Sequence, residues 1–426
     1  MAVDGFASLA HHDQQCTKRS KCVVGCMSGT SIDGLDTAML LVSDDSAGDG
    51  EGLELEIIGI HSQDFDPSLK GRLHAYANEE KALTAGDLCQ LQLDFANFHI
   101  EVITELLELC GKTPDLIAVH GQTVYHKPPL SMQMFTPAPL AQSFHCEVIC
   151  DMRAADIAAG GQGAPITPLA DYYLFKDPAR TVAVINLGGF CNVSYVFRDG
   201  RLKGKDICPV NQLLDAIANK FLLCPKGYDE DGHRAMAYCK ERGGDLSEYA
   251  EPPSGAPELT DYTEYVRAAM EGCDNSHSLG TEDSPAKWLD LVGTAVGQQH
   301  GTFIAYHACQ QIARRIASEV RADLQKEEAG AGGGAIAVLA GGGARHDLLF
   351  QMLQAYFKEG DIEVAKSSEV GAKAGVQDRE SISMAILGYL CSIDRPITVP
   401  AVTGVEVAPV SGMHVMPPYG HLRGRR

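Results

Sequence analysis

The chain lacks three patterns, and each absence excludes a class of protein or site. It has 14 cysteines in 426 residues but no C-x-x-C pair, so a zinc site is not indicated and buried thiols in a reducing, cytoplasmic compartment are predicted. It has no apolar run of about 18 residues, which argues against a membrane-spanning helix. It has no stripe of Lys and Arg, and its net charge is −21. Such a chain repels nucleic acid and anionic membranes, so neither is an expected partner.

The first 20 residues also lack an apolar core. They match neither a secretory signal nor a membrane anchor, and we expect residues 1–20 to be a flexible tail. The whole chain is 45% hydrophobic and 21% charged, an ordinary balance that at this length suggests two or three domains. A nucleotide or an anionic sugar bound by so acidic a chain must be held by local donors and a metal.

A polar turn between two apolar runs is the most informative segment. Residues 22–25 and 37–42 are typical of strands, and residues 26–36 between them read CMSGTSIDGLD. The glycines let backbone N–H groups approach a phosphate, and the hydroxyls add donors. The carboxylates can hold a Mg²⁺ that binds the phosphate. The turn therefore predicts ATP chemistry, with an ordinary Gly/Ser hairpin as the alternative.

The same design recurs later in the chain. Residues 181–185 and 193–197 are typical of strands, and the turn 186–192 between them reads NLGGFCN. Two such units predict duplicated domains. A third cluster, Gly341–Gly343, follows the apolar run 335–340 and precedes a helical pattern. That order suits a nucleotide, although tight helix–strand packing also selects glycine.

The remaining pattern is α/β. We expect a helix over residues 87–110 that ends at Gly111, a buried strand over 116–119 and a core helix over 295–323. The triplet at 111–113, GKT, resembles the end of a P-loop, but it follows a helix and lacks the earlier glycine, so we reject it. Surface loops are expected at 43–52, 242–257, 273–286 and 326–334.

Several short motifs occur along the chain in a fixed order. They are Met27–Ser31 with Asp33, Gly34 and Asp36; His120–Thr123; Asp151–Arg153 with Asp156; Gly160–Pro165; Asn186–Gly189 with Asn192; Asp229 with Asp231 and Gly232; Gly341–Gly343; Glu380; and Pro400 with Thr403 and Gly404. This ordered set resembles the anhydro-N-acetylmuramic acid kinase family, a branch of the actin/hexokinase/Hsp70-like ATPase superfamily, over nearly the full chain. The resemblance implies an α/β fold of two actin-like (ribonuclease H-like) lobes with an ATP/sugar cleft between them. Lobe I would comprise residues 21–180 and 377–426, and lobe II residues 181–376.

The resemblance also implies a reaction. Water opens the 1,6-anhydro bridge of 1,6-anhydro-N-acetylmuramic acid at C1 while O6 takes the γ-phosphate of ATP, which gives N-acetylmuramate 6-phosphate. This chemistry needs a base for the water, Mg-ATP and donors to phosphate. The implied partners are ATP and the anhydrosugar, the implied context is peptidoglycan recycling, and a homodimer is left open.

Residue roles follow from the same resemblance. Asp206 is the expected general base, with a turn residue as the alternative. Asp33 and Glu380 are the expected Mg²⁺ contacts, direct or through water, and a solvated acid in the first helical turn is the alternative for Glu380. The residues expected around the nucleotide are Ser28, Gly29, Thr30, Ser31, Gly34, Gly188 and Gly189 at the phosphates, and Gly341, Gly342 and Gly343 by the nucleoside.

The residues expected on the sugar side are His120, Gln122, Thr123, Arg153, Asp156 and Gln162. Arg153 suits a bidentate contact to the sugar carboxylate, and an internal ion pair with Asp156 or Asp151 is its alternative. His120 is typical of a hydrogen-bonding residue at a strand end, and we expect no chemical role for it.

The sequence departs from the family pattern at three places. Residues 206–211 read DICPVN where the family has DTGPGN, and Val210 brings a Cβ to a position where glycine allows close approach or a positive φ. This change can tilt Asp206 or crowd the γ-phosphate. The loop 252–258 lacks the family's basic residues, and Phe135 stands where a glycine is usual.

Two alternative functions stay open at this point. One is a kinase for another anhydrosugar, such as levoglucosan, which the missing basic loop favours. Gly161 favours the muramic acid substrate, because levoglucosan kinases carry a larger residue there. The other is a catalytically weakened nucleotide-binding homologue, which the altered turn at 207–210 favours and the retention of Asp33, Asp206 and Glu380 opposes.

Overall fold

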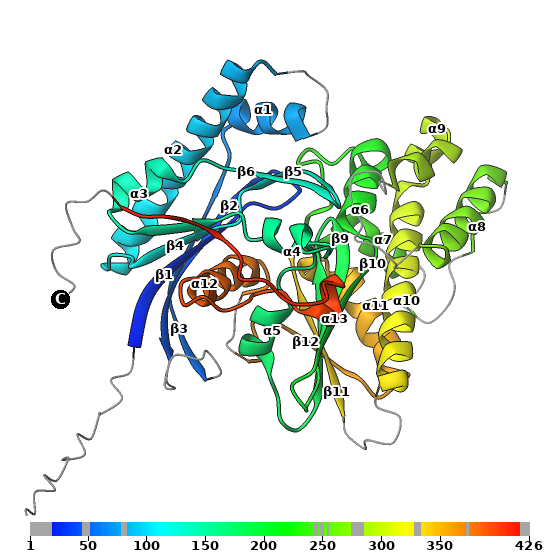
Figure 1. Cartoon of the computed structure of the whole chain (residues 1–426). Coiled ribbons are helices and arrows are strands. Elements are labelled where there is room, and N and C mark those ends of the chain that lie inside the picture. Colours follow the sequence, from blue (N-terminus) through cyan, green and yellow to red (C-terminus); the bar gives the residue numbers. More distant parts are fainter. Residues whose placement is uncertain are drawn as a thin grey trace, which may run out of the picture.

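Two β-sheets, each flanked by helices, make up the molecule (Figure 1). The computed structural model describes residues 19–44, 52–77, 83–241, 246, 251–253, 255–273, 285–327, 334–371 and 375–417. The predicted tail of residues 1–20 lies outside the described residues except for its last two positions. The loop expected at 43–52 and those at 242–257, 273–286 and 326–334 also lie largely outside them.

The first sheet has six strands in the order β13-β7-β4-β1-β2-β3. Strands β1, β2 and β3 form an antiparallel meander, and β4 and β7 continue the sheet parallel to β1. The strand bounds are Arg19–Met27 for β1, Gly34–Asp44 for β2, Leu53–Asp64 for β3, Leu116–Val119 for β4, Glu147–Cys150 for β7 and Met413–Val415 for β13. A separate hairpin pairs β5, Gln122–Lys127, with β6, Leu130–Met134.

The second sheet repeats this plan in the order β10-β9-β8-β11-β12. Its meander is β8, β9 and β10, and β11 and β12 run parallel to β8. The strand bounds are Thr181–Leu187, Phe190–Val196, Leu202–Pro209, Ala335–Ala340 and Glu363–Lys366 for β8 to β12. The duplicated design predicted from the two turns is therefore confirmed, and the fold is α/β with two actin-like (ribonuclease H-like) lobes.

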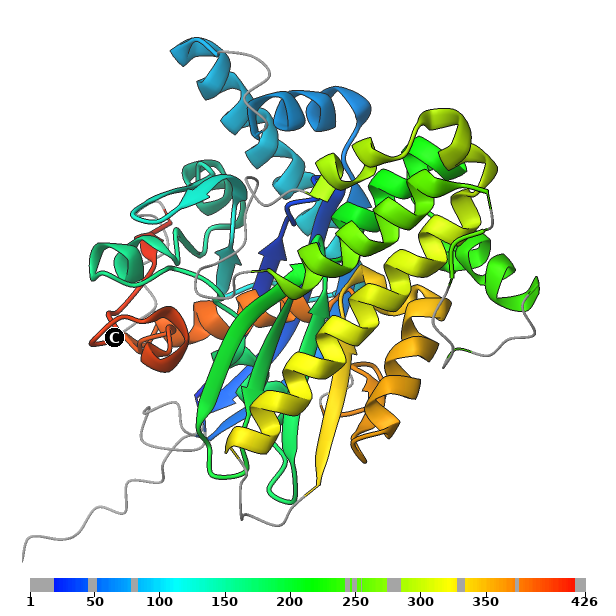
Figure 2. The same cartoon turned by 90° about the vertical axis from the view of Figure 1, so that its right-hand side faces the viewer.

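Helices cover the outer faces of both sheets and also fill the space between them. The long helix α2 packs on β2 and β3, and α10 packs on β10 and against α11 (Figure 2). The helix bounds are α1 Pro67–Ala77, α2 Ala85–Cys110, α3 Ala138–Phe144, α4 Ala154–Ala158, α5 Pro168–Phe175, α6 Asn211–Ile217, α7 His233–Glu241, α8 Pro257–Glu271, α9 Thr294–Gln299, α10 Gly301–Glu327, α11 Asp347–Lys358, α12 Arg379–Cys391 and α13 Pro400–Thr403. No helix within the described ranges is long and apolar enough to cross a membrane.

The predicted helix over 87–110 is confirmed as α2. Thr84 and Asp87 form a capping box at its start, and Gly111 ends it with φ 62°. Lys112 and Thr113 thus follow a helix C-terminus, which carries no free N–H groups for a phosphate. The rejection of the P-loop triplet is therefore confirmed.

The single helix expected over 295–323 is wrong. The structure has two helices, α9 and α10, with His300 between them. A Cβ on Gly297 would overlap the Phe221 ring, and one on Gly301 would lie 3.1 Å from Phe221 O. The glycines therefore serve close packing against Phe221, and they also weaken helix continuity at this point.

Helix α12 lies between the two sheets. It packs on β1, β2 and β4, and it shares one hydrophobic core with Val182 and Val338 of the second sheet. Every residue of α12 except Glu380 is buried. Gly25 of β1 permits the close approach, because a Cβ there would overlap Ser381 O. The helix thus carries one accessible carboxylate into the junction between the lobes.

Candidate functional site

The first polar turn, residues 28–33, joins β1 to β2. Ser28 is 3% exposed, and its Oγ donates a hydrogen bond of 2.6 Å to Gln122 Oε1. Gln122, fully buried, also donates from Nε2 to Gly29 O at 3.1 Å. Thr30 and Ser31 are exposed at the tip. A side chain from the segment after β4 therefore fixes the shape of this turn, and the expected contact of Gln122 with the sugar stays a prediction.

The second turn, Gly188–Gly189, joins β8 to β9 and is held by backbone alone. Val210 N donates to Gly189 O at 2.9 Å, and Asn211 N donates to Gly188 O at 3.0 Å. A Cβ built on Gly189 would lie 3.5 Å from Thr30 Oγ1. The turns of the two lobes therefore lie close together where Gly189 meets Thr30, and a side chain at position 189 would contact Thr30.

The triple glycine packs against the end of β8. Gly341 has φ 81°, and a Cβ there would lie 2.6 Å from Asn186 Oδ1. A Cβ on Gly343 would lie 2.9 Å from Leu187 Cβ. Tight packing therefore accounts for two of the three glycines. Gly342 has more room, with Asn211 and Gln377 as its nearest neighbours at 3.8 and 3.9 Å.

A row of polar side chains crosses the second sheet. Asp206 of β10 is the register partner of Asn192 in β9, and Asn192 is the partner of Asn186 in β8. Directly opposed residues on neighbouring strands share a face of the sheet. Asn186 Nδ2 then donates to Glu380 Oε1 at 3.0 Å. The row thus links Asp206, which is 9% exposed, to the start of α12.

Neither alternative for the two acids in this row fits their surroundings. Asp206 lies inside strand β10 and not in a turn. Glu380 is partly buried and accepts a hydrogen bond from another lobe, so it is not a solvated helix acid. Their catalytic and metal-binding roles stay predictions.

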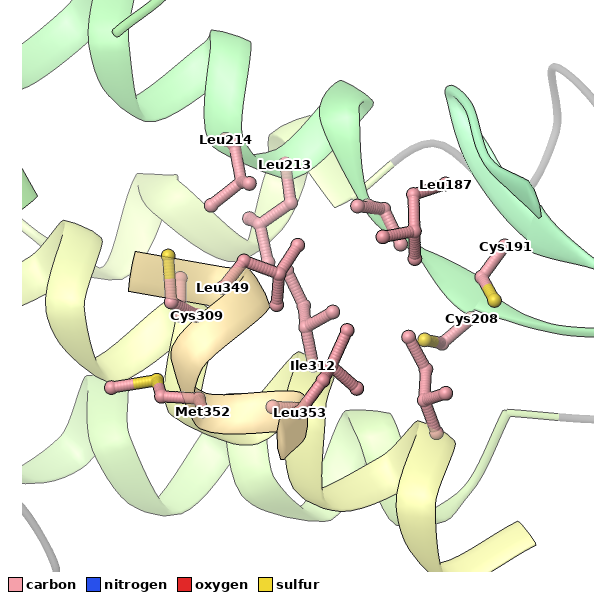
Figure 3. Packing of buried hydrophobic residues seen from close by; sticks show 14 of the residues in the cluster. Leu187, Cys191, Cys208, Leu213, Leu214, Cys309, Ile312, Leu349, Met352 and Leu353 are labelled. Atoms are coloured by element: carbon pink, nitrogen blue, oxygen red, sulfur yellow. The ribbon is translucent and has the colours of Figure 1, made fainter. Parts of the chain in front are cut away.

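The altered residues 207, 208 and 210 point into the core of lobe II. A bulge between Asp206 and Cys208 shifts the register, and Ile207, Cys208 and Val210 are each 0% exposed. Cys208 lies beside its cross-strand partner Cys191 in this core (Figure 3). Val210 has φ −127°. Val210 therefore needs no positive φ, and its bulk is absorbed by the core; the expected tilt of Asp206 or crowding of the γ-phosphate stays a prediction.

Four carboxylates gather where α12 meets the first turn. Burial raises the pKa of Asp36 to about 6, the hydrogen bond with Ser62 opposes this, and the charges of Asp33, Glu380 and Asp378 raise it further. Burial also raises the pKa of Asp378. Asp33 is exposed and accepts from Ser31 Oγ at 2.9 Å. The charges of these carboxylates therefore repel one another, and a cation would relieve that repulsion.

Arg153 precedes α4 and makes no ion pair with Asp156 or Asp151. Its Nε donates to His120 Nε2 at 3.0 Å, and its Nη1 donates to Gly163 O at 2.6 Å. The alternative of an internal ion pair between Arg153 and Asp156 or Asp151 is therefore wrong for this structure. The guanidinium is held by neutral acceptors, which leaves its charge available to a ligand.

The charges around Arg153 come from both lobes. Burial lowers its pKa to about 10, and the nearby carboxylates of Glu380, Asp206 and Asp156 oppose that shift. Arg153 therefore stays charged at neutral pH. The charge of Asp206, the expected base, acts on Arg153, which joins the sugar side of the site to the polar row.

His120 is a neutral support for Arg153. Burial, with the Arg153 charge, lowers its pKa to about 3. Because Nε2 accepts from Arg153, the ring proton is assigned to Nδ1, which donates to Gly121 O at 2.8 Å. This agrees with the expectation that His120 has no chemical role.

Asp156 organises the loop at 160–165. It is 0% exposed, its Oδ2 accepts from Gly163 N at 2.7 Å, and its Oδ1 accepts from Thr403 Oγ1 at 2.8 Å. A Cβ on Gly161 would overlap the Asp156 carboxylate. Gln162 N donates to Thr403 O at 2.8 Å and its side chain is partly buried. Asp156 therefore positions this loop, and its expected place on the sugar side stays a prediction.

Two further sequence features have a structural explanation. Thr123 is partly buried and its Oγ1 accepts from Gln133 Nε2 at 3.4 Å, so it belongs to the β5–β6 hairpin. Phe135, which replaces the usual glycine, packs its ring 6.2 Å from Phe95 and 5.0 Å from His99. That substitution fills the core beside α2 and leaves the polar row untouched.

Sequence reasoning quoted several site residues without giving them a role. Asn186 precedes the two glycines of the second turn and Asn192 follows them, and Asp36 ends the first motif. The repeated asparagine on both sides of a two-glycine turn was the available signal. Asp378 carried no signal, because its importance depends on where α12 enters the junction.

The donor set suits magnesium, although it is not a preformed cage. Among the described residues, no three His, Cys, Asp or Glu side chains are already arranged around a common metal position. Mg²⁺ takes oxygen ligands, keeps several waters and is usually bound by one or two carboxylates plus substrate phosphates. The carboxylates of Asp33, Asp36, Asp378 and Glu380 beside the paired turns fit that pattern.

Comparison with known proteins identifies relatives over nearly the whole chain. The family model described as anhydro-N-acetylmuramic acid kinase matches residues 21–240. A protein of that name from Idiomarina loihiensis is 30% identical over 402 residues, which cover 92% of this chain and 98% of the relative. Another from Picosynechococcus sp. is 29% identical over 401 residues, 90% of this chain and 96% of the relative.

Solved structures with a similar arrangement are more distant. An activator of 2-hydroxyisocaproyl-CoA dehydratase from Clostridium difficile with bound ADPNP is 12% identical, covers 86% of this chain and 94% of its own, and has a TM-score of 0.39. A ROK family glucokinase from Streptomyces griseus in complex with glucose and AMPPNP is 13% identical, covers 86% and 99%, and has a TM-score of 0.37. At this distance they carry no argument about chemistry.

Proposed function

The chain belongs to the anhydro-N-acetylmuramic acid kinase family, and from this premise we propose that it phosphorylates 1,6-anhydro-N-acetylmuramic acid with ATP. In the proposed reaction water adds to C1, the anhydro bridge opens, and O6 takes the γ-phosphate. The products are N-acetylmuramate 6-phosphate and ADP. The location we propose is the cytoplasm, in keeping with the described cysteines, which form no disulfide.

One observation carries the proposal: the polar row and the paired turns meet at α12. Asp206, Asn192 and Asn186 lead to Glu380, and Thr30 of one lobe lies close to Gly189 of the other. Phosphoryl transfer to a sugar oxygen needs a base, carboxylates that can hold a cation, and turns with donors to phosphate. We propose lobe limits of 21–180 with 377–426 and of 181–376, which agree with the membership of the two sheets.

Asp206 is the group we propose as general base. It is 9% exposed, so its carboxylate is partly desolvated, and it lies within the electrostatic reach of Arg153. A carboxylate held on a strand keeps a fixed position, which general-base catalysis requires. It would take a proton from the water as the water attacks C1. Residues 207 to 210 support this role because their side chains occupy the core and not the site.

The ATP phosphates would lie beside the two turns. Backbone N–H groups around Gly29, Thr30 and Gly189 would donate to them, with Ser31 and Thr30 hydroxyls at the exposed tip. Magnesium would supply positive charge that stabilises the negative charge of the phosphates. Asp33 and Glu380 would hold it, and the neighbouring Asp36 and Asp378 would add to the negative field.

Arg153 is the group we propose for the sugar's lactyl carboxylate. His120 and Gly163 fix two of its nitrogens, and both are neutral acceptors. The guanidinium fork suits a carboxylate. A neutral anhydrosugar such as levoglucosan lacks that group, so the two substrates should differ in their dependence on Arg153.

The test is a product assay with Mg-ATP and mass detection of the sugar phosphate. Wild type and Asp206→Asn are each given 1,6-anhydro-N-acetylmuramic acid and, separately, levoglucosan. We expect a ring-opened 6-phosphate from the first sugar, at a rate about 10³-fold lower in Asp206→Asn. Asp199→Asn, in the exposed turn after β9, is the matched control and should keep wild-type turnover.

Three results would contradict the proposal. Product from levoglucosan alone would move the protein to another sugar. Equal turnover by Asp206→Asn would remove Asp206 as the base. No product from either sugar, in folded protein that binds ATP, would favour the weakened nucleotide-binding homologue.

A further inference from the structure

A buried ion pair joins the two places where the chain passes between the lobes. The first passage runs through α5 into β8, and the second runs from β12 into α12. Arg379 opens α12, and Asp171 lies in the middle of α5, 208 residues earlier. Their side chains are 1% and 0% exposed. This pair is not among the residues that the sequence motifs single out.

The contact is bidentate. Arg379 Nε donates to Asp171 Oδ1 at 2.7 Å, and Nη2 donates to Asp171 Oδ2 at 2.5 Å. Nη2 also donates to Thr167 Oγ1 at 3.0 Å, just before α5 begins. A guanidinium fork on a carboxylate fixes both distance and orientation, which a single-point contact does not. The first turn of α12 is therefore held in one place relative to α5.

Glu380 is the next residue, and it is the only residue of α12 that is not buried. Its backbone position follows directly from that of Arg379. Its Oε1 is held from the second sheet by Asn186 Nδ2 at 3.0 Å. A side chain fixed at its base by one contact and at its tip by another has little freedom. The close approach of Gly371 to Leu174 O brings the same two chain passages together a second time.

We propose that Arg379 is a positioning residue: its bidentate contact with Asp171 fixes the start of α12 and thereby aims Glu380 at the nucleotide's cation. The inference rests on the proposed function, because Glu380 matters there as a Mg²⁺ contact. Some residues orient a metal-binding group without touching the metal. Substituting such a residue commonly lowers metal affinity by about 10- to 100-fold. Arg379 should behave in this way although it never meets the ligand.

The experiment measures binding of a non-hydrolysable ATP analogue by calorimetry, with and without Mg²⁺. The ratio of the two affinities is the magnesium enhancement, and it does not depend on turnover. The variants are Arg379→Lys, Glu380→Gln and the two combined. Lysine keeps the charge but cannot make the fork. We expect each single variant to lose about tenfold or more of the enhancement, with binding in the absence of Mg²⁺ little changed.

The combined variant decides between positioning and a general structural role. If Arg379 acts through Glu380, adding Arg379→Lys to Glu380→Gln costs no further enhancement, because the two changes remove the same interaction. If Arg379 only supports the fold, the two losses multiply, and the proposal is overturned. A wild type that binds the analogue without any magnesium enhancement would instead overturn the proposed function and this inference with it.

Two further variants keep the test decisive if Arg379→Lys folds poorly. The double change Arg379→Met with Asp171→Leu replaces a buried pair with apolar side chains, a swap that is often tolerated in stability. It should fold and still lose the enhancement. Arg180→Lys is the matched control, because Arg180 also pairs with carboxylates near these chain passages, Asp177 and Glu363, but is partly exposed. Its enhancement should equal that of wild type, and a similar loss there would contradict the inference.

Discussion

The turn between β1 and β2 and the turn between β8 and β9 occupy equivalent places, because five strands of the first sheet have the same arrangement as the five strands of the second. The two turns are nevertheless stabilised by different contacts. The first is long and polar, and the buried side chain of Gln122 fixes it from outside. The second is two glycines, and backbone bonds from Val210 and Asn211 fix it. The first turn thus offers hydroxyl and carboxylate side chains. The second turn has no side chains, which permits close approach to its backbone.

This difference shows how a duplicated unit can form one asymmetric site. The first turn also holds Ile32, a β-branched residue with φ 51°, which is a strained conformation. The second turn has no residue at positive φ. Strain and side-chain support are concentrated on the first turn, which carries the Asp33 carboxylate. The second turn, Gly188–Gly189, has no side chains and so lets the first turn approach closely. The predictions below test this division of roles.

Gly189→Ala should have the largest effect on nucleotide use. The new Cβ would lie 3.5 Å from Thr30 Oγ1 and 3.4 Å from Gln212 Cγ, so the fold accepts it, but the added methyl group contacts Thr30 where we propose that the phosphates bind. We expect the KM for ATP to rise about 10-fold or more, roughly 1.4 kcal/mol of binding, with an unchanged melting temperature. Steady-state kinetics and thermal unfolding measure the two quantities.

Gly341→Ala is the matched control for that substitution. Gly341 has φ 81°, and its Cβ would lie 2.6 Å from Asn186 Oδ1. Here we expect a loss of stability of about 1–3 kcal/mol. If Gly189→Ala instead destabilised the fold while ATP use stayed normal, the second turn would be a structural element only.

Gln122→Ala should affect the first turn through loss of its support. The Ser28 hydroxyl and Gly29 carbonyl would lose their buried partner. The expected cost is about 1–3 kcal/mol of unfolding free energy, and weaker ATP binding should accompany it. Chemical denaturation and analogue binding test this. Gln133→Ala, which removes hydrogen bonds to Thr123 and Ser131 within the β5–β6 hairpin but none to the first turn, is the control, and equal effects of the two changes would count against the account.

Asp36→Asn should stabilise the metal-free protein in a pH-dependent way. The pKa of Asp36 rises from 3.8 to about 6 on folding, mainly through burial. The folded state therefore binds more protons between these values, and stability falls as pH rises through that window. Removing the carboxyl should raise the melting temperature above pH 6 and change little near pH 4.

The pH series has an internal control of opposite sign. Interactions with Ala179 N and Arg180 lower the pKa of Asp177, so Asp177→Asn should slightly lower stability at neutral pH and lose that effect in acid. A pH-independent gain from Asp36→Asn would mean that the carboxyl charge is not the cause.

Local sequence could predict the parts of this fold that depend on neighbouring residues. The glycines and hydroxyls of residues 28–34 predicted a phosphate turn, and the capping residues Thr84 and Gly111 delimit α2 as the apolar periodicity indicated. Asp206 came from an ordered motif, and its placement in a strand beside the polar row was beyond local reasoning. The core position of Val210, which follows β10, was missed because the bulge between Asp206 and Cys208 shifts the register just before it.

Long-range contacts account for the rest. Nothing near Arg379 in the sequence reveals Asp171, and the raised pKa of Asp36 depends on α12 arriving from the far end of the chain. The break at His300 required knowing that Gly297 and Gly301 meet Phe221. Each of these follows from packing between distant segments, which a single sequence does not display.

The central claim is that this site couples water attack on the sugar to phosphoryl transfer. Turnover of 1,6-anhydro-N-acetylmuramic acid with Mg-ATP in ¹⁸O-labelled water tests it most directly, with mass spectrometry of the products before the anomeric oxygen exchanges. The account predicts one ¹⁸O at C1 of the sugar 6-phosphate and none in its phosphate group. Label found only in inorganic phosphate, with no sugar phosphate formed, would show ATP hydrolysis alone and would contradict it.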